Sequence, residues 1–231
     1  MSKDLSVVMP VYNEEECISQ VVEKWVVALD KLNISYDINV YNDGSKDQTL
    51  AALNSAAQKF PTLKVNDKKN SGHGPTILLG YKNSTNYQWI FQIDSDDELG
   101  PEKFAELWAD RANYDFLIGQ RDGRFSPLPR KIISLISRWV VWVFYGTGVW
   151  DVNSPYRLMR AEKFKPVYNE IPADTFAPNV IITGMACKKK MRIKEIQVPY
   201  KDRQTGEVSI KKWKLFKAAV KSFRQTIKAA F

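Results

Sequence analysis

Leu5-Ser-Val-Val-Met-Pro-Val11 is an apolar run that ends abruptly in the polar residues Tyr12-Asn13-Glu14-Glu15. A short apolar run with polar flanks is typical of a buried strand. The segment 14–32 then carries apolar residues at helical spacing, namely Ile18, Val21, Val22, Trp25, Val26 and Leu29. A buried strand followed by an amphipathic helix begins a βαβ unit, in which neighbouring strands lie parallel.

The same alternation continues along the chain. Periodicity predicts further strands at 36–41, 63–65, 89–93 and 114–118, and helices at 47–60, 74–82 and 101–112, the last opened by Pro101. This order predicts an α/β fold with a doubly wound, mostly parallel central sheet and helices on both faces. No repeat, low-complexity segment or linker divides the chain into domains.

Composition indicates a globular protein with a full core, since the 231 residues are 44% hydrophobic and 12% aromatic. The two cysteines, Cys17 and Cys187, are too far apart to suggest a metal motif or a disulfide framework, so we expect a reducing compartment and two buried thiols. The first apolar run is too short for a secretory signal, and we therefore expect a cytoplasmic protein.

Charge divides the chain into two unlike halves. Residues 1–110 hold 10 Lys and Arg against 17 Asp and Glu, a net charge of −7, whereas residues 111–231 hold 24 against 9, a net charge of +15. The acidic half suits metal binding, and the basic half suits phosphate groups or an anionic membrane surface.

Polar loops follow three of the predicted strands, at 12–15, 42–45 and 94–98. Because ligands of such sheets bind outside the carboxyl ends of the strands, we expect these loops to converge. Asp94 and Asp96, one residue apart, can share a divalent cation, and hard oxygen ligands suit Mg²⁺ or Mn²⁺. The alternative is a solvated acidic loop before the helix at Pro101.

Two further loops have both a structural and a functional interpretation. Asp43 precedes Gly44 in a turn whose Asp47 can cap the next helix, but its carboxylate can equally accept hydrogen bonds from a nucleoside. Gly72 lies in a loop that enters a helix, where amide N–H groups could meet a phosphate. His73 is the only histidine, and a loop histidine is more often structural than catalytic. Neither a dinucleotide-binding fingerprint nor a P-loop is present.

The segments Val8-Met-Pro-Val-Tyr-Asn-Glu-Glu15, Asn42-Asp-Gly-Ser-Lys-Asp-Gln-Thr49 and Asp94-Ser-Asp96, in this order and spacing, resemble glycosyltransferase family two with the GT-A fold. The resemblance extends from about residue 5 to 210, and is greatest to dolichol-phosphate mannosyltransferases and bacterial polyprenyl-phosphate sugar transferases. It implies that Pro10, Tyr12, Glu14, Asp43, Gly72, Asp94 and Ser95 bind the nucleotide-sugar. It also implies a metal held by Asp94, Asp96 and Glu98, although the relatives commonly have Gln at the last position.

The basic half resembles the acceptor side of the same enzymes. Gly119-Gln-Arg121, Arg130-Lys-Ile-Ile-Ser134 and Arg203-Gln-Thr-Gly-Glu-Val-Ser209 are similar to their phosphate-binding segments. In Asp151-Val-Asn-Ser-Pro-Tyr-Arg157, Pro155 replaces the family's glycine. The resemblance implies that Arg121, Arg130, Ser134, Arg203 and Ser209 bind the acceptor phosphate. Asp96, Arg121, Arg130 and Arg203 are the predicted catalytic residues, with Asp96 acting mainly through the metal.

Two segments suit a membrane interface. Lys211 to Phe231 contains no acidic residue and places an apolar stripe beside a basic one. Ile132 to Trp150 is rich in Trp and Tyr, which favour the interface, but it carries too many polar residues for a membrane span. In both segments the alternative is that the apolar face packs on the domain.

These observations predict a GT-A domain at 1–210, with a donor and metal half at 1–110 and an acceptor half at 111–210, followed by a basic amphipathic helix at 211–231. The predicted activity is inverting transfer from a UDP- or GDP-sugar to a polyprenyl phosphate by a peripheral protein on the cytoplasmic face of a membrane. Because many relatives carry C-terminal transmembrane helices, a membrane-protein partner is also possible.

The alternatives are a transferase with a glycan or other non-lipid acceptor, a family member without activity, and a non-catalytic binder of anionic surfaces or nucleic acid. The nucleic-acid interpretation leaves the carboxylates unexplained, so no nucleic-acid partner is expected.

Overall fold

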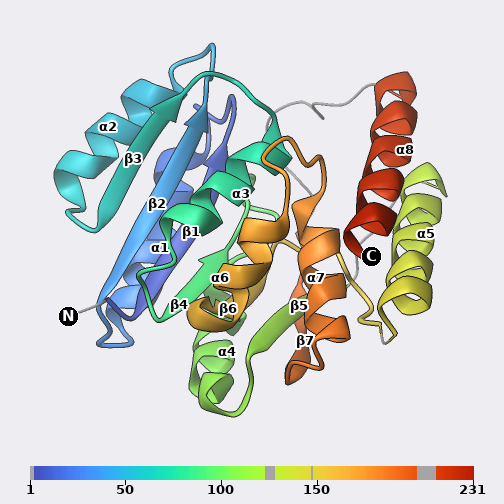
Figure 1. The fold of residues 1–231 in the computed structure, drawn as a ribbon. Coiled ribbons are helices and arrows are strands. Elements are labelled where there is room, and N and C mark those ends of the chain that lie inside the picture. The colour runs from blue at the N-terminus through green and yellow to red at the C-terminus, as the bar shows by residue number, and fades with distance from the viewer. Residues whose placement is uncertain (1–2, 123–127, 147, 202–211) are drawn as a thin grey trace.

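A single mixed sheet forms the centre of the molecule (Figure 1). The computed structural model describes residues 3–122, 128–146, 148–201 and 212–231. Within these ranges, seven strands lie in the order β3-β2-β1-β4-β6-β5-β7. Their bounds are β1 Leu5–Val11, β2 Tyr36–Asp43, β3 Leu63–Lys68, β4 Trp89–Gln92, β5 Phe116–Asp122, β6 Arg157–Arg160 and β7 Ile193–Pro199.

The sheet has a parallel half and a mixed half. β1 pairs in parallel with both β2 and β4, and β2 pairs in parallel with β3. β6 runs antiparallel between β4 and β5, whereas β5 and β7 are parallel. The mostly parallel architecture predicted from the sequence is therefore confirmed. The prediction did not include β6 and β7.

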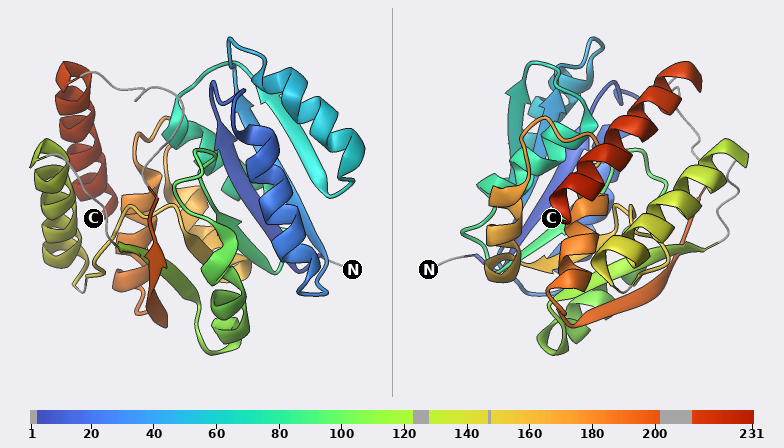
Figure 2. Two further views of the ribbon diagram at one scale, coloured as in Figure 1. Left: turned by 180° about the vertical axis from the view of Figure 1, so that it is seen from behind. Right: turned by 45° about the vertical axis from the view of Figure 1, so that its right-hand side comes forward.

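Helices cover both faces of the sheet. α1, α2 and α4 lie on one face, and α3, α6 and α7 lie on the other (Figures 1 and 2). A 3₁₀ turn beginning at Pro101 precedes α4, as the proline predicted, and another follows it. The helices span α1 Ile18–Asp30, α2 Thr49–Lys59, α3 His73–Asn83, α4 Phe104–Asp110, α5 Leu128–Tyr145, α6 Ala161–Glu170, α7 Pro178–Lys188 and α8 Lys212–Ala229.

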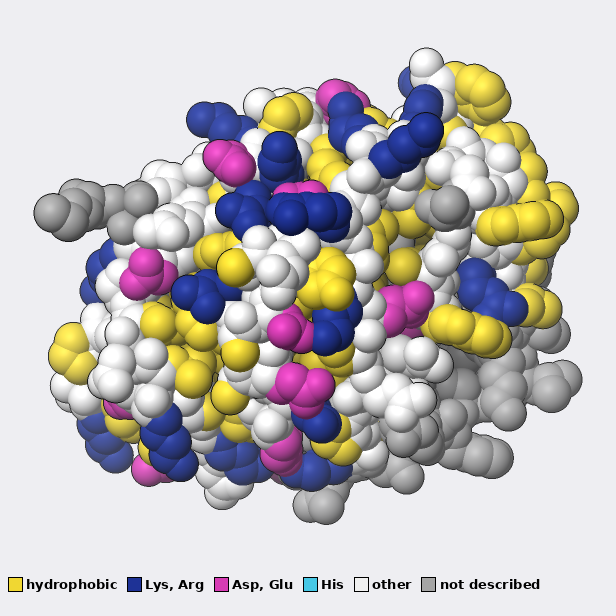
Figure 3. Space-filling model, turned by 90° about the horizontal axis from the view of Figure 1, so that it is seen from below, with side chains coloured by type: hydrophobic (Ala, Val, Ile, Leu, Met, Phe, Trp, Pro, Cys, Tyr) yellow, Lys and Arg dark blue, Asp and Glu magenta, His cyan; other side chains and the backbone are white. Residues whose placement is uncertain are grey.

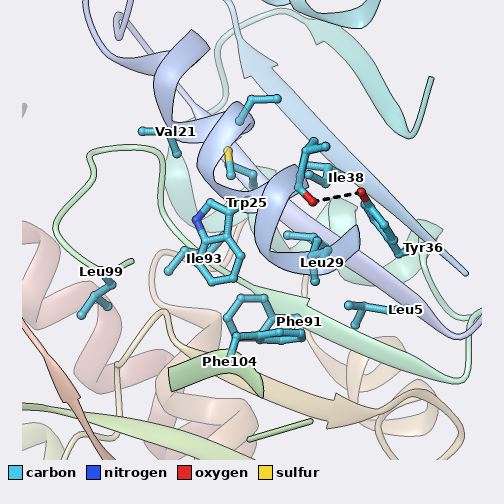
Figure 4. Packing of buried hydrophobic residues seen from close by; sticks show 14 of the residues in the cluster. Leu5, Val21, Trp25, Leu29, Tyr36, Ile38, Phe91, Ile93, Leu99 and Phe104 are labelled. Atoms are coloured by element: carbon cyan, nitrogen blue, oxygen red, sulfur yellow. Dashed lines mark hydrogen bonds between the residues drawn. The ribbon is translucent and has the colours of Figure 1, made fainter. Parts of the chain in front are cut away.

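Alternating residues of the strands supply the two apolar layers. In β1, Val7 and Met9 face the layer under α1, whereas Val8 faces the layer under α3. Trp25 of α1 anchors the first layer, with its ring centroid 5.3 Å from that of Phe91 on β4; Figure 4 shows the two rings together with Phe104. Burial of one such aromatic side chain contributes about 1.5–3 kcal/mol. Cys17 and Cys187 are both buried, as expected.

α5 and α8 lie side by side at the β7 edge of the sheet (Figures 1 and 2). The Tyr145 hydroxyl donates to the Thr226 carbonyl oxygen at 2.7 Å. Gly184 of α7 leaves room for the Tyr145 ring, because a Cβ there would stand 2.8 Å from it. α5 ends at Tyr145, where Gly146 adopts φ +96°. In the described part of the chain, none of the helices has the length and apolarity needed to cross a bilayer.

Candidate functional site

Loops from three strands meet at the carboxyl edge of the parallel half, as predicted. Asn13 joins the first two loops, because its amide donates to Ser45 Oγ at 3.0 Å and its side-chain oxygen accepts from the Lys46 amide at 2.8 Å. The Glu14 amide donates to Thr49 Oγ1 at 2.8 Å. Cys17 connects the third loop, with its thiol 3.5 Å from the Ser95 carbonyl oxygen. These bonds connect the three loops to one another.

The acidic loop after β4 carries the strongest sequence signal. The Asp94 side chain is 30% exposed, and its Oδ1 accepts a hydrogen bond from Gln92 Nε2 at 2.9 Å. His73, the first residue of α3, places its Nε2 3.7 Å from the same oxygen. Asp96 Oδ1 accepts from the Glu98 amide at 3.3 Å. The loop thus presents partly exposed carboxylates beside the start of α3.

The donor set fits a divalent cation that is shared with a ligand. Among the residues that the structure describes, no three acidic, histidine or cysteine side chains are gathered into a metal-binding group, so Asp94, Asp96 and Glu98 do not form a closed cage. Mg²⁺ and Mn²⁺ sites of phosphate-transfer and related enzymes commonly take one or two carboxylates and complete their shell with substrate oxygens and water. The carboxylates of Asp94 and Asp96 match that kind of site. Glu98 as a third ligand stays a prediction.

Asp43 is engaged by the chain itself. Its carboxylate accepts hydrogen bonds from the amides of Ser71 and Gly72, at 2.8 and 2.9 Å, and pairs with Lys68. Burial opposes ionisation, but Lys68 and these amides prevail and hold the pKa of the Asp43 carboxyl below its usual range. The amide of Gly72, predicted to meet a phosphate, is therefore already used, and Asp43 fixes the loop that enters α3.

The turn interpretation of this region is also supported at Asp47. Its Oδ1 accepts from the amide of Thr49, the first residue of α2, at 3.0 Å. Asp47 thus satisfies a free N–H at the start of the helix, as the sequence predicted. Of the other predicted nucleotide-binding residues, Pro10, Tyr12 and Glu14 lie on or beside β1, where Pro10 and Glu14 are buried and Tyr12 is half-buried. Ser95 is buried in the loop after β4.

On the acceptor side, Arg121 is held by Asp151. Arg121 Nε and Nη2 donate to the two Asp151 oxygens at 2.6 and 2.9 Å, which is a bidentate pair. Burial opposes the charge, but Asp151, followed by Asp94 and Glu98, raises the pKa of the Arg121 guanidinium. This predicted phosphate-binding residue therefore lies within electrostatic reach of the acidic loop.

Arg157 organises the loop that carries Asp151. Its guanidinium is fully buried and donates to the carbonyl oxygens of Val152, Ser154 and Asn179 at 3.2, 2.8 and 3.1 Å. Pro155, the departure from the family pattern, is buried within the same loop. The loop is thus closed around a buried cation despite the missing glycine.

Some of the predicted acceptor residues cannot be placed at the site. Arg203 and Ser209 lie outside the described residues, as does the side chain of Arg130 on α5. Ser134 is exposed on α5. The last described residue before Arg203 is Lys201, whose amide donates to the Glu98 carbonyl oxygen at 2.9 Å. These four residues stay predictions.

The sequence analysis missed two buried amides at the site, Gln92 and Asn179. Each is a polar residue in an otherwise apolar element, Gln92 in Trp-Ile-Phe-Gln and Asn179 in Pro-Asn-Val-Ile-Ile. A polar side chain within a buried strand or helix requires a polar partner. A polar residue inside an apolar run is therefore the sequence signal that could have identified Gln92 and Asn179.

Comparison with known proteins relates this chain to transferases. The chain is 27% identical over 208 residues to undecaprenyl-phosphate 4-deoxy-4-formamido-L-arabinose transferase from Photorhabdus laumondii, covering 89% of this chain and 62% of the relative. The enzyme of the same name from Edwardsiella ictaluri is 27% identical over 206 residues, covering 88% of this chain and 62% of the relative. The chain therefore spans only about three fifths of these relatives' length.

Solved structures show the same fold. Glucosyl-3-phosphoglycerate synthase from Mycobacterium tuberculosis, in complex with Mn²⁺, UDP and phosphoglyceric acid, matches with a TM-score of 0.72 and 14% identity, covering 99% of this chain and 78% of that one. S. aureus TarS 1–349 in complex with UDP matches with a TM-score of 0.61 and 19% identity, covering 93% and 63%. The GT-A prediction for the fold is confirmed. The family model for glycosyl transferase family 2 matches residues 6–171, which is most of the chain. The chain therefore belongs to this family.

Proposed function

We propose that this chain catalyses inverting transfer of a sugar from a UDP- or GDP-sugar to a polyprenyl phosphate at a membrane surface. The observation that carries the proposal is the loop after β4, which presents partly exposed Asp94 and Asp96 carboxylates beside the start of α3, together with the Arg121 guanidinium that Asp151 holds on the acceptor side. A donor diphosphate and an acceptor phosphate are both anionic, and this edge offers a cation site on one side and a fixed guanidinium on the other. The undecaprenyl-phosphate transferases among the relatives support the choice of acceptor.

Asp94 and Asp96 would hold the Mg²⁺ or Mn²⁺ ion. When bound, such an ion neutralises the charge that develops on the departing diphosphate. The structural neighbour that holds Mn²⁺ and UDP supports a UDP-sugar over a GDP-sugar. His73 and the first turn of α3 lie beside Asp94 and would complete the donor side.

Arg121 would position the acceptor phosphate. A phosphate oxygen is already an anionic nucleophile, so a strong general base is not required for attack on the anomeric carbon. Asp151 occupies Nε and Nη2 of Arg121, which leaves Nη1 for a phosphate oxygen. Asp151 keeps this fork oriented, and Arg130, Ser134, Arg203 and Ser209 would add further donors. Orientation of this kind is a large part of what an enzyme contributes to a two-substrate reaction.

The membrane surface is proposed to contact α5 and α8. Figure 3 shows hydrophobic side chains gathered on the side of the molecule where these helices lie. The exposed members on α5 are Leu135, Ile136, Trp139, Trp142 and Val143, and Trp142 is 61% exposed. On α8, Val220 and Phe223 are exposed beside Lys221 and Arg224, whereas Thr226 and Ala230 pack on the domain. Exposed tryptophans beside basic residues suit the interface of an anionic bilayer.

The donor site can be tested by calorimetric titration of UDP and GDP, each with and without Mn²⁺, against wild type and Asp94→Ala. We expect one nucleotide to bind in a metal-dependent way, and we expect the substitution to abolish that dependence. Absence of binding by either nucleotide would contradict the donor site and favour the anionic-surface binder.

The acceptor can be tested by extraction. With a radiolabelled donor and undecaprenyl phosphate in detergent, the product should enter the organic phase. Label that enters only water-soluble products would instead favour the glycan or other non-lipid acceptor.

A further inference from the structure

A buried hydrogen-bond network connects the acidic loop to the loop that carries Asp151. It begins at Asp94 Oδ1, which accepts from Gln92 Nε2 at 2.9 Å. Gln92 Oε1 in turn accepts from Asn179 Nδ2 at 2.9 Å. The Asn179 carbonyl oxygen accepts from Arg157 Nη1 at 3.1 Å, and Arg157 closes the loop 151–157. Gln92, Asn179 and Arg157 thus connect a predicted metal ligand in the loop after β4 to the acceptor side.

Tyr81 lies against both amides of the network, whose direction follows from the Asp94 oxygen that accepts at its end. Its hydroxyl lies 3.0 Å from Gln92 Oε1 and 2.8 Å from Asn179 Oδ1, and either oxygen can accept its proton. Burial raises the pKa of Tyr81, so the hydroxyl stays a donor. Because Asn179 Nδ2 and Tyr81 both face Gln92 Oε1, the amide of Gln92 must present its N–H group to Asp94.

Burial makes this arrangement specific. Gln92 and Tyr81 are fully buried and Asn179 is 3% exposed, so water cannot replace a lost partner without a cavity. Their elements, β4, α3 and α7, also belong to the core, which fixes the distances. In metal sites, partners that orient a ligating side chain commonly change metal affinity about 10- to 100-fold when they are removed.

We propose that Gln92 is a positioning residue for Asp94, and that Asn179 and Tyr81 orient it toward the metal edge. The donated N–H holds Oδ1, and the remaining lone pairs of the carboxylate would be left for a cation. This inference rests on the proposed function, because it requires Asp94 to be a metal ligand. It adds residues that contact neither the metal nor a substrate.

The test compares metal-dependent UDP binding in Gln92→Met and Tyr81→Phe with wild type, by calorimetry in Mn²⁺ and in EDTA. Tyr168→Phe is the matched control, since Tyr168 stacks on Tyr81 with ring centroids 5.1 Å apart but bonds to Met159 Sδ instead of the amides. We expect Gln92→Met to weaken UDP binding in Mn²⁺ about 10- to 100-fold. Tyr81→Phe should weaken it about three- to tenfold. Tyr168→Phe should leave it unchanged, and binding in EDTA should stay constant in all of them.

The measurements in Mn²⁺ and in EDTA distinguish a structural defect from failure of the inference and from failure of the proposed function. A general structural defect would lower binding in EDTA as well, and would contradict positioning. Folded Gln92→Met and Tyr81→Phe proteins that bind UDP in Mn²⁺ as wild type does would overturn the inference while leaving the proposed function intact. If Gln92→Met does not fold, the comparison of Tyr81→Phe with Tyr168→Phe decides alone. A wild type without metal-dependent binding would overturn the proposed function and this inference together.

Discussion

The donor and acceptor sides of this molecule are built in different ways. On the donor side, backbone amides and short polar side chains hold the loops after β1 and β2 together, and the Cys17 thiol contacts the loop after β4. On the acceptor side, the charge of Arg121 is matched by Asp151, and Arg157 is enclosed by carbonyl oxygens. The difference indicates that the donor edge is held by several short bonds between backbone amides and side-chain oxygens, whereas the acceptor edge depends on two guanidinium groups and their partners.

The most severe test of this comparison is Asp94→Asn. The substitution keeps the shape of the side chain but removes the charge that a divalent cation requires, so we expect sugar transfer to fall at least about 100-fold. Transfer of label from the UDP-sugar measures the effect. Asp97→Asn is the control, because Asp97 lies on the same loop, pairs with Lys24 and has φ +57°, a conformation that Asn tolerates. Equal losses in both variants would show that loop integrity, not the Asp94 charge, is the requirement.

On the acceptor side, Arg121→Lys should lower kcat/KM for polyprenyl phosphate about 30-fold, close to 2 kcal/mol, because an ammonium cannot keep a bidentate pair and also face a phosphate. UDP binding should stay constant, since the donor edge does not depend on the Arg121 guanidinium. Steady-state kinetics with varied acceptor separate the two effects.

Arg192→Lys serves as the control for Arg121→Lys. Arg192 forms a similar two-bond pair with Asp115, at 3.0 and 3.2 Å, at the opposite end of β5. Its replacement should leave kcat/KM unchanged. A comparable loss of activity in this variant would attribute the Arg121 effect to the stability of the sheet.

The sequence predicted the donor side better than the acceptor side for a physical reason. β1, β2 and β4 are short apolar runs that end in polar residues, and that local pattern alone predicts parallel strands with a common ligand edge. β6 reads Arg-Leu-Met-Arg and lies antiparallel between two strands. That position depends on long-range pairing, which local periodicity does not contain. The engagement of Asp43 by Ser71 and Gly72 likewise depends on two loops that are distant in the sequence.

The proposed membrane face extends the comparison to the outer surface. Trp139→Ala combined with Trp142→Ala should reduce binding to phosphatidylglycerol vesicles by about tenfold or more, because each exposed ring would otherwise insert into the interface. Vesicle sedimentation measures the effect. Val27→Ala combined with Leu79→Ala removes exposed apolar groups from α1 and α3 and should leave vesicle binding unchanged. Retained binding in the tryptophan variant would show that α5 is not the docking face.

The last expected effect concerns the stability of the donor edge and not its activity, and Asp43 reports it. Lys68 and two amides hold the pKa of the Asp43 carboxyl below its usual range. The ionised carboxylate therefore stabilises the folded state at any pH above the ordinary carboxyl pKa. This contribution is lost as the pH falls through the lowered pKa of Asp43. In Asp43→Asn, the free energy of unfolding should therefore be lower by about 1–3 kcal/mol at pH 7. This difference in the free energy of unfolding between wild type and Asp43→Asn should narrow only below about pH 4.

Urea unfolding between pH 3 and pH 7 measures both quantities, since the slope of the free energy of unfolding against pH reports the protons bound on unfolding. A gap that does not change with pH would mean that the carboxylate charge contributes nothing to the turn, and that the donor edge depends on its ligand for order as the acceptor edge does on its side-chain pairs.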